Sequence, residues 1–203
     1  MNYRVVEIFG SIQGEGLRAG IPVIFIRLAG CNLKCSWCDT KHDEFTVLSE
    51  EELINRCEAL TPIKNIVWTG GEPCLQLQER TIQIFKQLGY HQAIETNGTR
   101  RIPAGLDYIT ISPKPGSILA HQYDYTSIAE WKVPYIPPAV GEPEQIKLPP
   151  KHLTNKIRNK LLSPVFRADN EVEPYYVQKA VEWLKKHPTW RLSVQVHKLI
   201  EIK

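Results

Sequence analysis

The sequence predicts an α/β protein, a truncated and partly open (β/α) barrel of about six largely parallel strands. Short apolar runs alternate with segments of helical periodicity, which is typical of a parallel sheet. Four successive predicted strands end in polar or glycine-bearing loops, where sheets of this kind bind ligands. A closed eight-unit barrel usually needs about 250 residues, whereas this chain has 203. We expect residues 1–203 to form a single domain.

The first half of the chain contains three predicted strands and two predicted helices. "PVIFIRLAG" (22–30) indicates a buried strand that leads into a cysteine-rich loop. A helix is expected over 48–60, with Ser49 as its N-cap and Glu52 completing a capping box. The strand "NIVWT" leads to the turn "GGEP" and a helix over 75–88 that ends at Gly89, and the strand "AIET" follows.

The second half is interrupted by prolines and yields shorter elements. "DYITIS", "EWKVPYI" and "NKLLSPVF" predict strands, and 174–187 predicts a helix with basic residues in its last turn. "RLSVQVHKL" (191–199) alternates between apolar and polar residues and predicts a final strand. Its polar face carries Ser193, Gln195 and His197, which would suit a strand that lines a pocket.

Composition and charge exclude several functional classes. The chain is 42% hydrophobic and 23% charged with a net charge of +3, which is ordinary for a globular protein and too small for a general polyanion binder. A basic run at 151–160 is interpreted as the solvated face of a helix, so we expect no nucleic-acid partner. No segment has the length of a signal peptide core or a membrane span, so we expect no membrane association and a cytoplasmic location.

Three cysteines within eight residues are the strongest chemical signal. Cys31, Cys35 and Cys38 have a C-x3-C-x2-C spacing that lets three thiolates converge from one loop. In a reducing compartment such a cluster indicates a metal centre or catalysis before disulfides. With His42 it could form a Cys3His zinc site, whereas an iron-sulfur cube would keep one iron open to a small molecule.

The cysteine spacing resembles the motif of the radical S-adenosylmethionine superfamily. Trp37 lies between the last two cysteines, where that superfamily carries an aromatic residue. The "GGEP" turn at Gly70, Gly71 and Glu72 resembles its cofactor motif, which holds the amino group of the methionine part. The resemblance implies a radical SAM type of barrel and a [4Fe-4S] cluster whose open iron binds S-adenosylmethionine.

Nearly the whole chain resembles one family within that superfamily, the 7-carboxy-7-deazaguanine synthases. The resemblance is carried in order by "EIFGSIQGEG", "IFIRLAGC", "CSWCDTKH", "VWTGGEPC", "IETNGT", "ITISPKP", "AEWKVP" and "WRLSVQVHK". It implies a homodimeric lyase that converts 6-carboxytetrahydropterin to 7-carboxy-7-deazaguanine and ammonia, a step toward 7-deazapurines such as queuosine. A radical derived from the cofactor would take hydrogen from the substrate, the ring would contract, and the hydrogen would return. A flavodoxin-like electron donor is also implied.

The same resemblance assigns roles to individual residues and implies no catalytic side chain beyond the cofactor radical. The expected cluster ligands are Cys31, Cys35 and Cys38, and the expected Mg²⁺ ligand is Thr40. The expected S-adenosylmethionine contacts are Trp37, Asp39, Gly70, Gly71, Glu72, Gly98, Ser112, Pro113, Lys114 and Ser163. The expected substrate contacts are Ile12, Gln13, Gly14, Arg27 and Thr96.

Elementary chemistry fits several of these roles and leaves one of them open. The Gln13 amide can pair with a pterin edge, and Mg²⁺ prefers oxygen ligands such as the Thr40 hydroxyl. Arg27 could bind the substrate carboxylate in a bidentate fork or neutralise a neighbouring Asp or Glu. Two departures from many relatives are Ser163 in place of glutamine and Val196 in place of threonine.

Two other functions compete with the synthase. A small activating enzyme of the same superfamily would form a glycyl radical on a partner protein and would need a docking surface instead of a pterin pocket. The "SIQGEG" segment and Arg27 argue against it. A zinc-stabilised binding module without catalysis is the second alternative, and metal content would distinguish it from an iron-sulfur enzyme.

Overall fold

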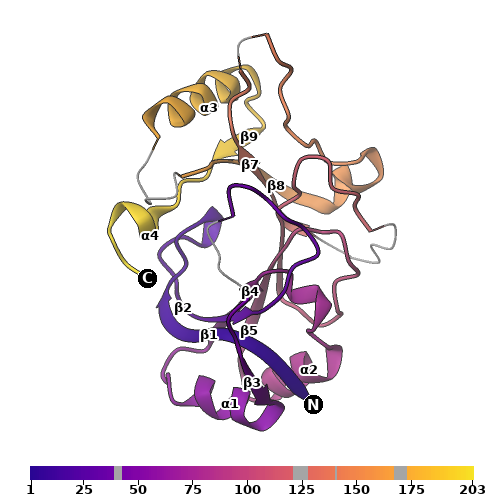
Figure 1. The fold of residues 1–203 in the computed structure, drawn as a ribbon, viewed down its shortest axis with the longest axis vertical. Coiled ribbons are helices and arrows are strands. Elements are labelled where there is room, and N and C mark those ends of the chain that lie inside the picture. Colours follow the sequence, from indigo (N-terminus) through magenta and orange to yellow (C-terminus); the bar gives the residue numbers. More distant parts are fainter. Residues whose placement is uncertain (39–42, 121–127, 140, 167–172) are drawn as a thin grey trace.

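A computed structural model describes residues 1–38, 43–120, 128–139, 141–166 and 173–203. Nine strands of the described part form one sheet in the order β3-β1-β2-β4-β5-β6-β7-β8-β9 (Figure 1). The strands are β1 (Asn2–Ile12), β2 (Pro22–Leu28), β3 (Thr46–Ser49), β4 (Asn65–Gly70), β5 (His91–Thr96), β6 (Tyr108–Ile111), β7 (Ile128–Tyr135), β8 (Ile157–Pro164) and β9 (Trp190–Leu192).

The expectation of a largely parallel, open α/β sheet is confirmed, but the sheet is larger than the predicted six strands. From β2 to β9 all neighbouring pairs are parallel, with Ile24 of β2 opposite Ile66 of β4. β1 and β3 extend one edge and pair antiparallel, β1 with β2 and β3 with β1. These two strands were missed because neither follows the strand-helix alternation on which the prediction was based.

The two faces of the sheet bury different kinds of side chain, because successive residues of a strand point to opposite faces. Ile24, Ile26 and Leu28 of β2 belong to the main hydrophobic core, which continues into α1 and α2 through Leu53 and Phe85. The inner face has a small apolar cluster of Val23, Val67 and Ala93, with Phe25 and Tyr108 packed against it. The rest of the inner face is available for polar side chains.

The helices follow the sequence closely. The chain has α1 (Glu50–Glu58), α2 (Glu79–Gln87), α3 (Pro174–Lys186), α4 (Val196–Leu199) and the short 3-10 segments η1 (Gly16–Arg18), η2 (Pro73–Leu75) and η3 (Lys151–Lys156). The predicted capping box is present, since the Glu52 amide donates to the Ser49 hydroxyl and the Ser49 amide donates to the Glu52 carboxylate. In Figure 1, α1 and α2 lie at one end of the molecule, beside β3, and α3 lies at the other, beside β9.

Two local predictions are wrong. The final strand ends at Leu192, and α4 follows where alternation predicted strand 191–199. β9 pairs with β8 alone, so it has no second neighbour that would extend it. The basic run at 151–160 forms η3 and the start of β8 instead of a helix face, because residues from Ile157 onward pair with β7.

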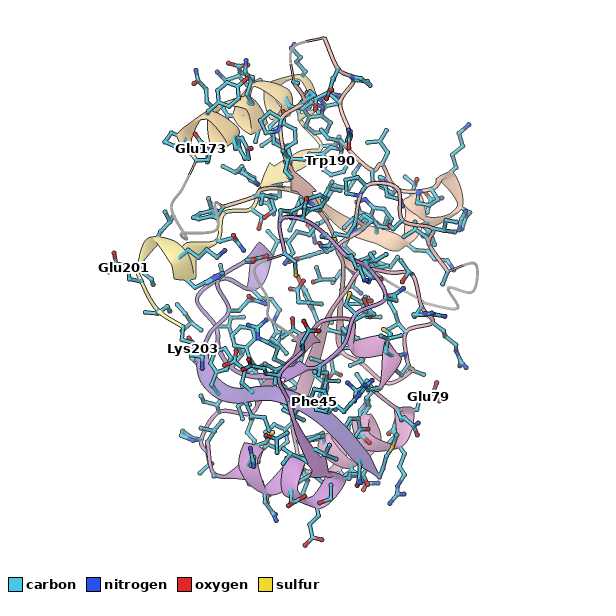
Figure 2. All side chains as sticks on the ribbon, viewed as in Figure 1. Phe45, Glu79, Glu173, Trp190, Glu201 and Lys203 are labelled. Atoms are coloured by element: carbon cyan, nitrogen blue, oxygen red, sulfur yellow. The ribbon has the colours of Figure 1, made fainter. Side chains whose placement is uncertain are left out.

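The inner face of the sheet is covered by two chain segments, one that follows β1 and one that follows β9. Ser193, just after β9, accepts a hydrogen bond at Oγ from the Gly16 amide at 2.9 Å. The Val196 amide donates to the Gly14 carbonyl at 2.8 Å. The loop of residues 13–21, here called the N-terminal loop, therefore lies against the C-terminal segment, and side chains fill the space inside the curved sheet (Figure 2). Among the described residues no helix has the length and hydropathy needed to cross a membrane.

Candidate active site

The cysteine loop follows β2 and presents its thiols at the carboxyl end of the parallel sheet. Cys31 and Cys35 are half-buried and Cys38 is exposed, and the Cys38 amide donates to the Cys35 carbonyl at 3.2 Å. Burial raises the pKa of Cys31 and of Cys35, and the charge of Cys38 raises the pKa of both further. The three thiols thus lie on one loop at the carboxyl end of β2, where thiolates could bind an iron-sulfur centre.

The described residues form no group of three His, Cys, Asp or Glu side chains tight enough to hold a single ion. An iron-sulfur cube instead distributes its thiolates over separate iron corners. Asp39, Thr40 and His42, which the sequence suggested as a cofactor contact, a Mg²⁺ ligand and a fourth zinc ligand, lie outside the described residues.

The Gly-Gly turn is built to dock on the cysteine loop. The Gly71 amide donates to the Leu28 carbonyl at 3.0 Å, and the Glu72 amide donates to the Gly30 carbonyl at 2.9 Å. A Cβ atom on Gly70 would lie 2.0 Å from the Leu28 carbonyl oxygen, and one on Gly71 would lie 2.0 Å from that of Gly30. The absence of side chains at these two glycines therefore makes room for the main chain before Cys31.

Glu72 is fully buried and oriented by three donors. Its Oε1 accepts from the Cys74 amide at 2.9 Å and from the Thr96 hydroxyl at 2.7 Å. Its Oε2 accepts from the Asn97 amide at 2.8 Å. The carboxylate therefore joins the ends of β4 and β5, and Oε2, which accepts from one donor only, keeps acceptor capacity for a further donor such as an ammonium group. Thr96, expected to contact substrate, is placed against this carboxylate.

Trp37 lines a hollow of about 150 Å³ that opens to solvent. Pro134 and Tyr135 at the end of β7 form another part of its wall, together with Pro115. Ser163 of β8 lies opposite Pro134 in the strand register, so this expected cofactor residue lies beside the hollow. Its lining of aromatic and proline surface suits a flat heteroaromatic ring.

The loop after β6 brings a cation toward the thiols. The Lys114 ammonium donates to the Ser112 hydroxyl at 2.8 Å. Burial lowers the pKa of Lys114, and the charge of Lys132 lowers it further, whereas Cys35 opposes this shift. Pro113, which lies between Ser112 and Lys114, is buried. The Gly98 carbonyl, just after β5, accepts a hydrogen bond from the Ala120 amide at 3.0 Å.

Arg27 pairs with a neighbouring carboxylate, which is one of the two roles that the sequence left open for it. Its Nε donates to Glu7 Oε1 at 2.9 Å. Lys203 approaches the other oxygen of Glu7 at 2.6 Å, so the C-terminal end of the chain lies on β1. Burial opposes ionisation of Glu7, but its hydrogen bonds to Lys203 and Arg27 lower the pKa below the ordinary value. Arg27 thus stands on the inner-facing side of β2, already oriented by a carboxylate.

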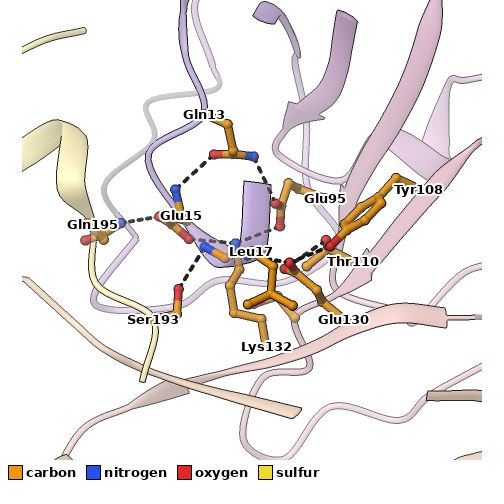
Figure 3. Close-up of polar contacts among 12 residues, drawn as sticks. Gln13, Glu15, Leu17, Glu95, Tyr108, Thr110, Glu130, Lys132, Ser193 and Gln195 are labelled. Carbon is orange, nitrogen blue, oxygen red and sulfur yellow. Dashed lines mark hydrogen bonds and ion pairs between the residues drawn. The ribbon is translucent and has the colours of Figure 1, made fainter. Parts of the chain in front are cut away.

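The centre of the inner face holds an ionic network that sequence reasoning missed (Figure 3). The Lys132 ammonium of β7 lies 2.6 Å from Glu15 Oε2 and 2.9 Å from Glu95 Oε2. Gln13, on the adjoining loop, donates from Nε2 to Glu95 Oε1 at 3.4 Å and accepts at Oε1 from the Glu15 amide at 3.1 Å. Gln195 of the C-terminal segment donates to Glu15 Oε1 at 2.6 Å.

One ammonium shared by two carboxylates makes those carboxylates chemically unequal. Burial disfavours ionisation of Glu15, yet Lys132 outweighs it and lowers the pKa of Glu15 to about 2. Burial raises the pKa of Glu95 to about 7, because the opposing effect of Lys132 is offset by repulsion from Glu15. Glu15 therefore ionises more readily than Glu95, although both carboxyls face the same ammonium.

Glu130 forms a second anchor for the N-terminal loop. Its Oε1 accepts from the Leu17 amide at 2.7 Å and from the Tyr108 hydroxyl at 2.8 Å. Gln13, Glu95 and Arg18 pack around the same groups and leave no space for a water-sized molecule. Arg18 Nη1 is buried without a hydrogen-bond partner among the described residues. Carboxylate acceptors and one donor without a partner thus lie close together on the inner face.

A sequence signal for this network exists, although it was not used. Glu130 and Lys132 stand two residues apart in the otherwise apolar run "AEWKVP", so they face the same side of β7. Tyr108 and Thr110 repeat this spacing in β6. Charged residues at alternate positions of a central strand indicate a buried polar face.

These features define the class of protein. The model described as the Radical SAM superfamily matches residues 25–117, which include the cysteine loop, the Gly-Gly turn and the Ser112–Lys114 loop. Together with the open parallel sheet, the match makes the chain a radical S-adenosylmethionine enzyme, a class that uses a [4Fe-4S] cluster and S-adenosylmethionine.

Individual relatives narrow the class to a family. A 7-carboxy-7-deazaguanine synthase from Bacteroides thetaiotaomicron is 37% identical over the full length of both chains. The synthase from Haemophilus influenzae is 38% identical and covers all of this chain and 95% of its own. The crystal structure of QueE from Escherichia coli matches with a TM-score of 0.74 at 26% identity, covering 97% of this chain and 95% of that one. The chain belongs to the 7-carboxy-7-deazaguanine synthase family.

Proposed function

We propose that this protein is a lyase that converts 6-carboxy-5,6,7,8-tetrahydropterin to 7-carboxy-7-deazaguanine and ammonia by radical ring contraction, in 7-deazapurine biosynthesis. The observation that carries the proposal is the docking of a three-cysteine loop on the Gly-Gly turn, beside a polar inner face. This arrangement occurs in a chain that aligns over its full length with named synthases.

The carboxyl ends of β2, β4 and β6 would hold the cluster and S-adenosylmethionine. Cys31, Cys35 and Cys38 would ligate three irons, and the bound cofactors would supply a carbon radical that abstracts hydrogen. Glu72 has a fixed, buried carboxylate with spare acceptor capacity, so it would bind the ammonium of the methionine part. Trp37 would contact the adenine ring in the hollow that it lines.

The remaining expected cofactor contacts lie around these groups or outside the described residues. Support for Gly98, Ser112, Pro113 and Lys114 comes from their place at the ends of β5 and β6. Ser163 lies beside the hollow through its register with Pro134. Asp39 would complete the set from the segment that follows Cys38.

The substrate would lie on the inner face. The Gln13 amide, held between Glu15 and Glu95, would meet the pterin edge, with Ile12 and Gly14 on either side. Arg27, oriented by Glu7, would pair with the substrate carboxylate. Thr96 would approach the substrate from the end of β5, and Mg²⁺ on Thr40 would bind further substrate oxygens.

The same family membership supports three wider proposals. The protein would act as a homodimer, would receive electrons from a flavodoxin-like donor, and would work in the cytoplasm. None of these depends on a particular residue described above, and each can be tested independently of the reaction.

Anaerobic incubation with the pterin, S-adenosylmethionine and a reductant tests the function. We expect formation of the deazaguanine product, in a protein that contains about four irons. A protein that binds stoichiometric zinc instead would be a zinc-stabilised module. A protein with the cluster that cleaves S-adenosylmethionine reductively but forms no deazaguanine would favour an activating enzyme.

The magnesium site has its own variant. Thr40→Ala should lower product formation or abolish its dependence on Mg²⁺, while iron content stays unchanged because the thiolates are intact. Ser117→Ala is the matched control. The Ser117 hydroxyl donates to the Lys114 carbonyl within the loop after β6, and it has no proposed metal role. Equal Mg²⁺ dependence in both variants would refute the assignment.

A further inference from the structure

We propose that Lys132 is a positioning residue of this site: its ammonium ties Glu15 of the N-terminal loop to Glu95 of β5 and thereby fixes the Gln13 amide over the inner face. The inference rests on the proposed function in one respect, namely that the inner face receives the substrate. The tie between loop and sheet is a property of the folded chain and can be measured without turnover.

The contacts of Gln13 carry the argument. Its amide oxygen accepts from the Glu15 amide at 3.1 Å, and its amide nitrogen donates to Glu95 Oε1 at 3.4 Å. The two residues that orient Gln13 are therefore the same two that Lys132 holds, at 2.6 Å and 2.9 Å (Figure 3). A shift of the Glu95 carboxylate would move the acceptor of the Gln13 amide nitrogen, and a shift of Glu15 that carries its main chain along would move the donor to the Gln13 amide oxygen.

Lys132 is the more buried and more rigidly held end of this contact. The Lys132 side chain is 7% exposed, against 20% for Glu15 and 19% for Glu95. Lys132 stands on β7, whose neighbours β6 and β8 are paired with it on both sides, so the ammonium is attached to a rigid element. The N-terminal loop is the part that would adjust if the tie were absent.

Other contacts of the loop hold its main chain but not the Gln13 side chain. The Gly16 amide donates to Ser193 Oγ at 2.9 Å, and the Leu17 amide donates to Glu130 Oε1 at 2.7 Å. These bonds would remain when Lys132 is replaced. We therefore expect a local displacement of the substrate contact and not the loss of the loop.

Charge explains why the position needs a cation. Glu15 and Glu95 face the same point, and further charged or titratable groups around them include Glu130, Tyr108, Arg18, Lys114 and His197. Without Lys132 the charge of Glu15 would be left in a buried position without its cationic partner, which is strongly disfavoured. Relief would come from movement of Glu15 together with the loop.

Lys132→Met tests the proposal by kinetics and by hydrogen exchange. We expect KM for the pterin to rise on the order of 100-fold, as for a substrate contact displaced by about 1 Å, with unchanged iron content and reductive cleavage of S-adenosylmethionine. Amides of residues 13–21 should exchange faster by roughly tenfold or more, while β4 and β5 keep their protection. Lys179→Met, which breaks an exposed pair with Glu182, is the matched control and should change neither readout.

A triple variant separates positioning from simple charge neutralisation. Lys132→Met with Glu15→Gln and Glu95→Gln removes the tie but leaves no uncompensated buried charge, so its fold does not depend on how the single variant accommodates two unpaired carboxyls. The Glu15 amide and a carbonyl oxygen at position 95 would still be present to bond Gln13. A raised KM and rapid exchange of the loop in this variant support positioning.

Opposite results overturn the inference. KM and loop exchange of wild-type size in the triple variant would mean that Lys132 only neutralises charge. If the wild-type protein forms no deazaguanine, the proposed function fails, yet the exchange of residues 13–21 still decides whether Lys132 fixes the loop. Unchanged exchange in Lys132→Met would refute the tie regardless of the reaction.

Discussion

Replacing Glu15 by Gln should move the titration of Glu95, because the two carboxyls compete for one ammonium. In the native protein the pKa of Glu95 is raised from 4.5 to about 7, by burial and by repulsion from Glu15, against the attraction of Lys132. Glu15→Gln removes the repulsion and leaves Lys132 wholly to Glu95. We expect the pKa of Glu95 to fall toward its ordinary value, while burial, the largest cause of its rise, still opposes ionisation.

The assay is a ¹³C NMR titration of protein that carries labelled glutamate. The Glu95 carboxyl resonance is assigned by its disappearance in Glu95→Gln. The wild-type protein should show a carboxyl that titrates near neutral pH, and Glu15→Gln should shift this transition toward acid. A Glu95 resonance that already titrates near 4.5 in the wild type, or one that Glu15→Gln leaves in place, would refute the reasoning.

The same shift has a consequence for stability. Folded Glu95 keeps its proton up to about pH 7 and the unfolded chain releases it near 4.5, so folding binds protons in this window. Its contribution to the free energy of unfolding is fully present below 4.5 and is lost as pH rises through 7. Glu15 has the opposite sign, because its lowered pKa gives stability above 4.5 that is lost as pH falls toward 2.

Two further predictions concern the framework of the site. Gly71→Ala should lower iron content, because the new Cβ would lie 2.0 Å from the Gly30 carbonyl oxygen and would displace the cysteine loop. Gly116→Ala is the control, since a Cβ there would meet open space. It should lower the free energy of unfolding by only about 1–2 kcal/mol, because of its left-handed backbone, and leave iron content unchanged. Ser49→Ala should lower the free energy of unfolding by about 0.5–2 kcal/mol, because α1 loses its N-cap. Product formation should not change. An unchanged thermal midpoint would contradict the role of the capping box that Ser49 forms with Glu52.

The sequence predicted those elements that are determined by residues close together in the chain. The capping box of Ser49 and Glu52, the stop of α2 before Gly89 and the buried strands of the parallel sheet each depend on neighbouring residues. Gly89 has a φ of +80°, as expected for a glycine that ends a helix. The motif of Cys31, Cys35 and Cys38 was visible for the same reason, since its spacing is contained in one loop.

The rest depends on pairings between distant parts of the chain. β1 forms because β2 and β3 flank it, and its sequence lacks the short apolar run that marks the central strands. Alternation of residues 191–199 satisfied the strand pattern, but backbone pairing with β8 stops at Ser193, whose amide donates to the Leu162 carbonyl, and the Val196 amide then donates to the Gly14 carbonyl of the N-terminal loop. Lys132 and Glu15 are separated by 117 positions, so no local rule could join them.

The absence of side chains at Gly70 and Gly71 makes the turn and the thiol-bearing loop one mechanical unit. Their main chains touch without any intervening group that could absorb a displacement. A displacement of the loop that carries Cys31 would therefore pass directly to the Gly-Gly turn through two backbone hydrogen bonds.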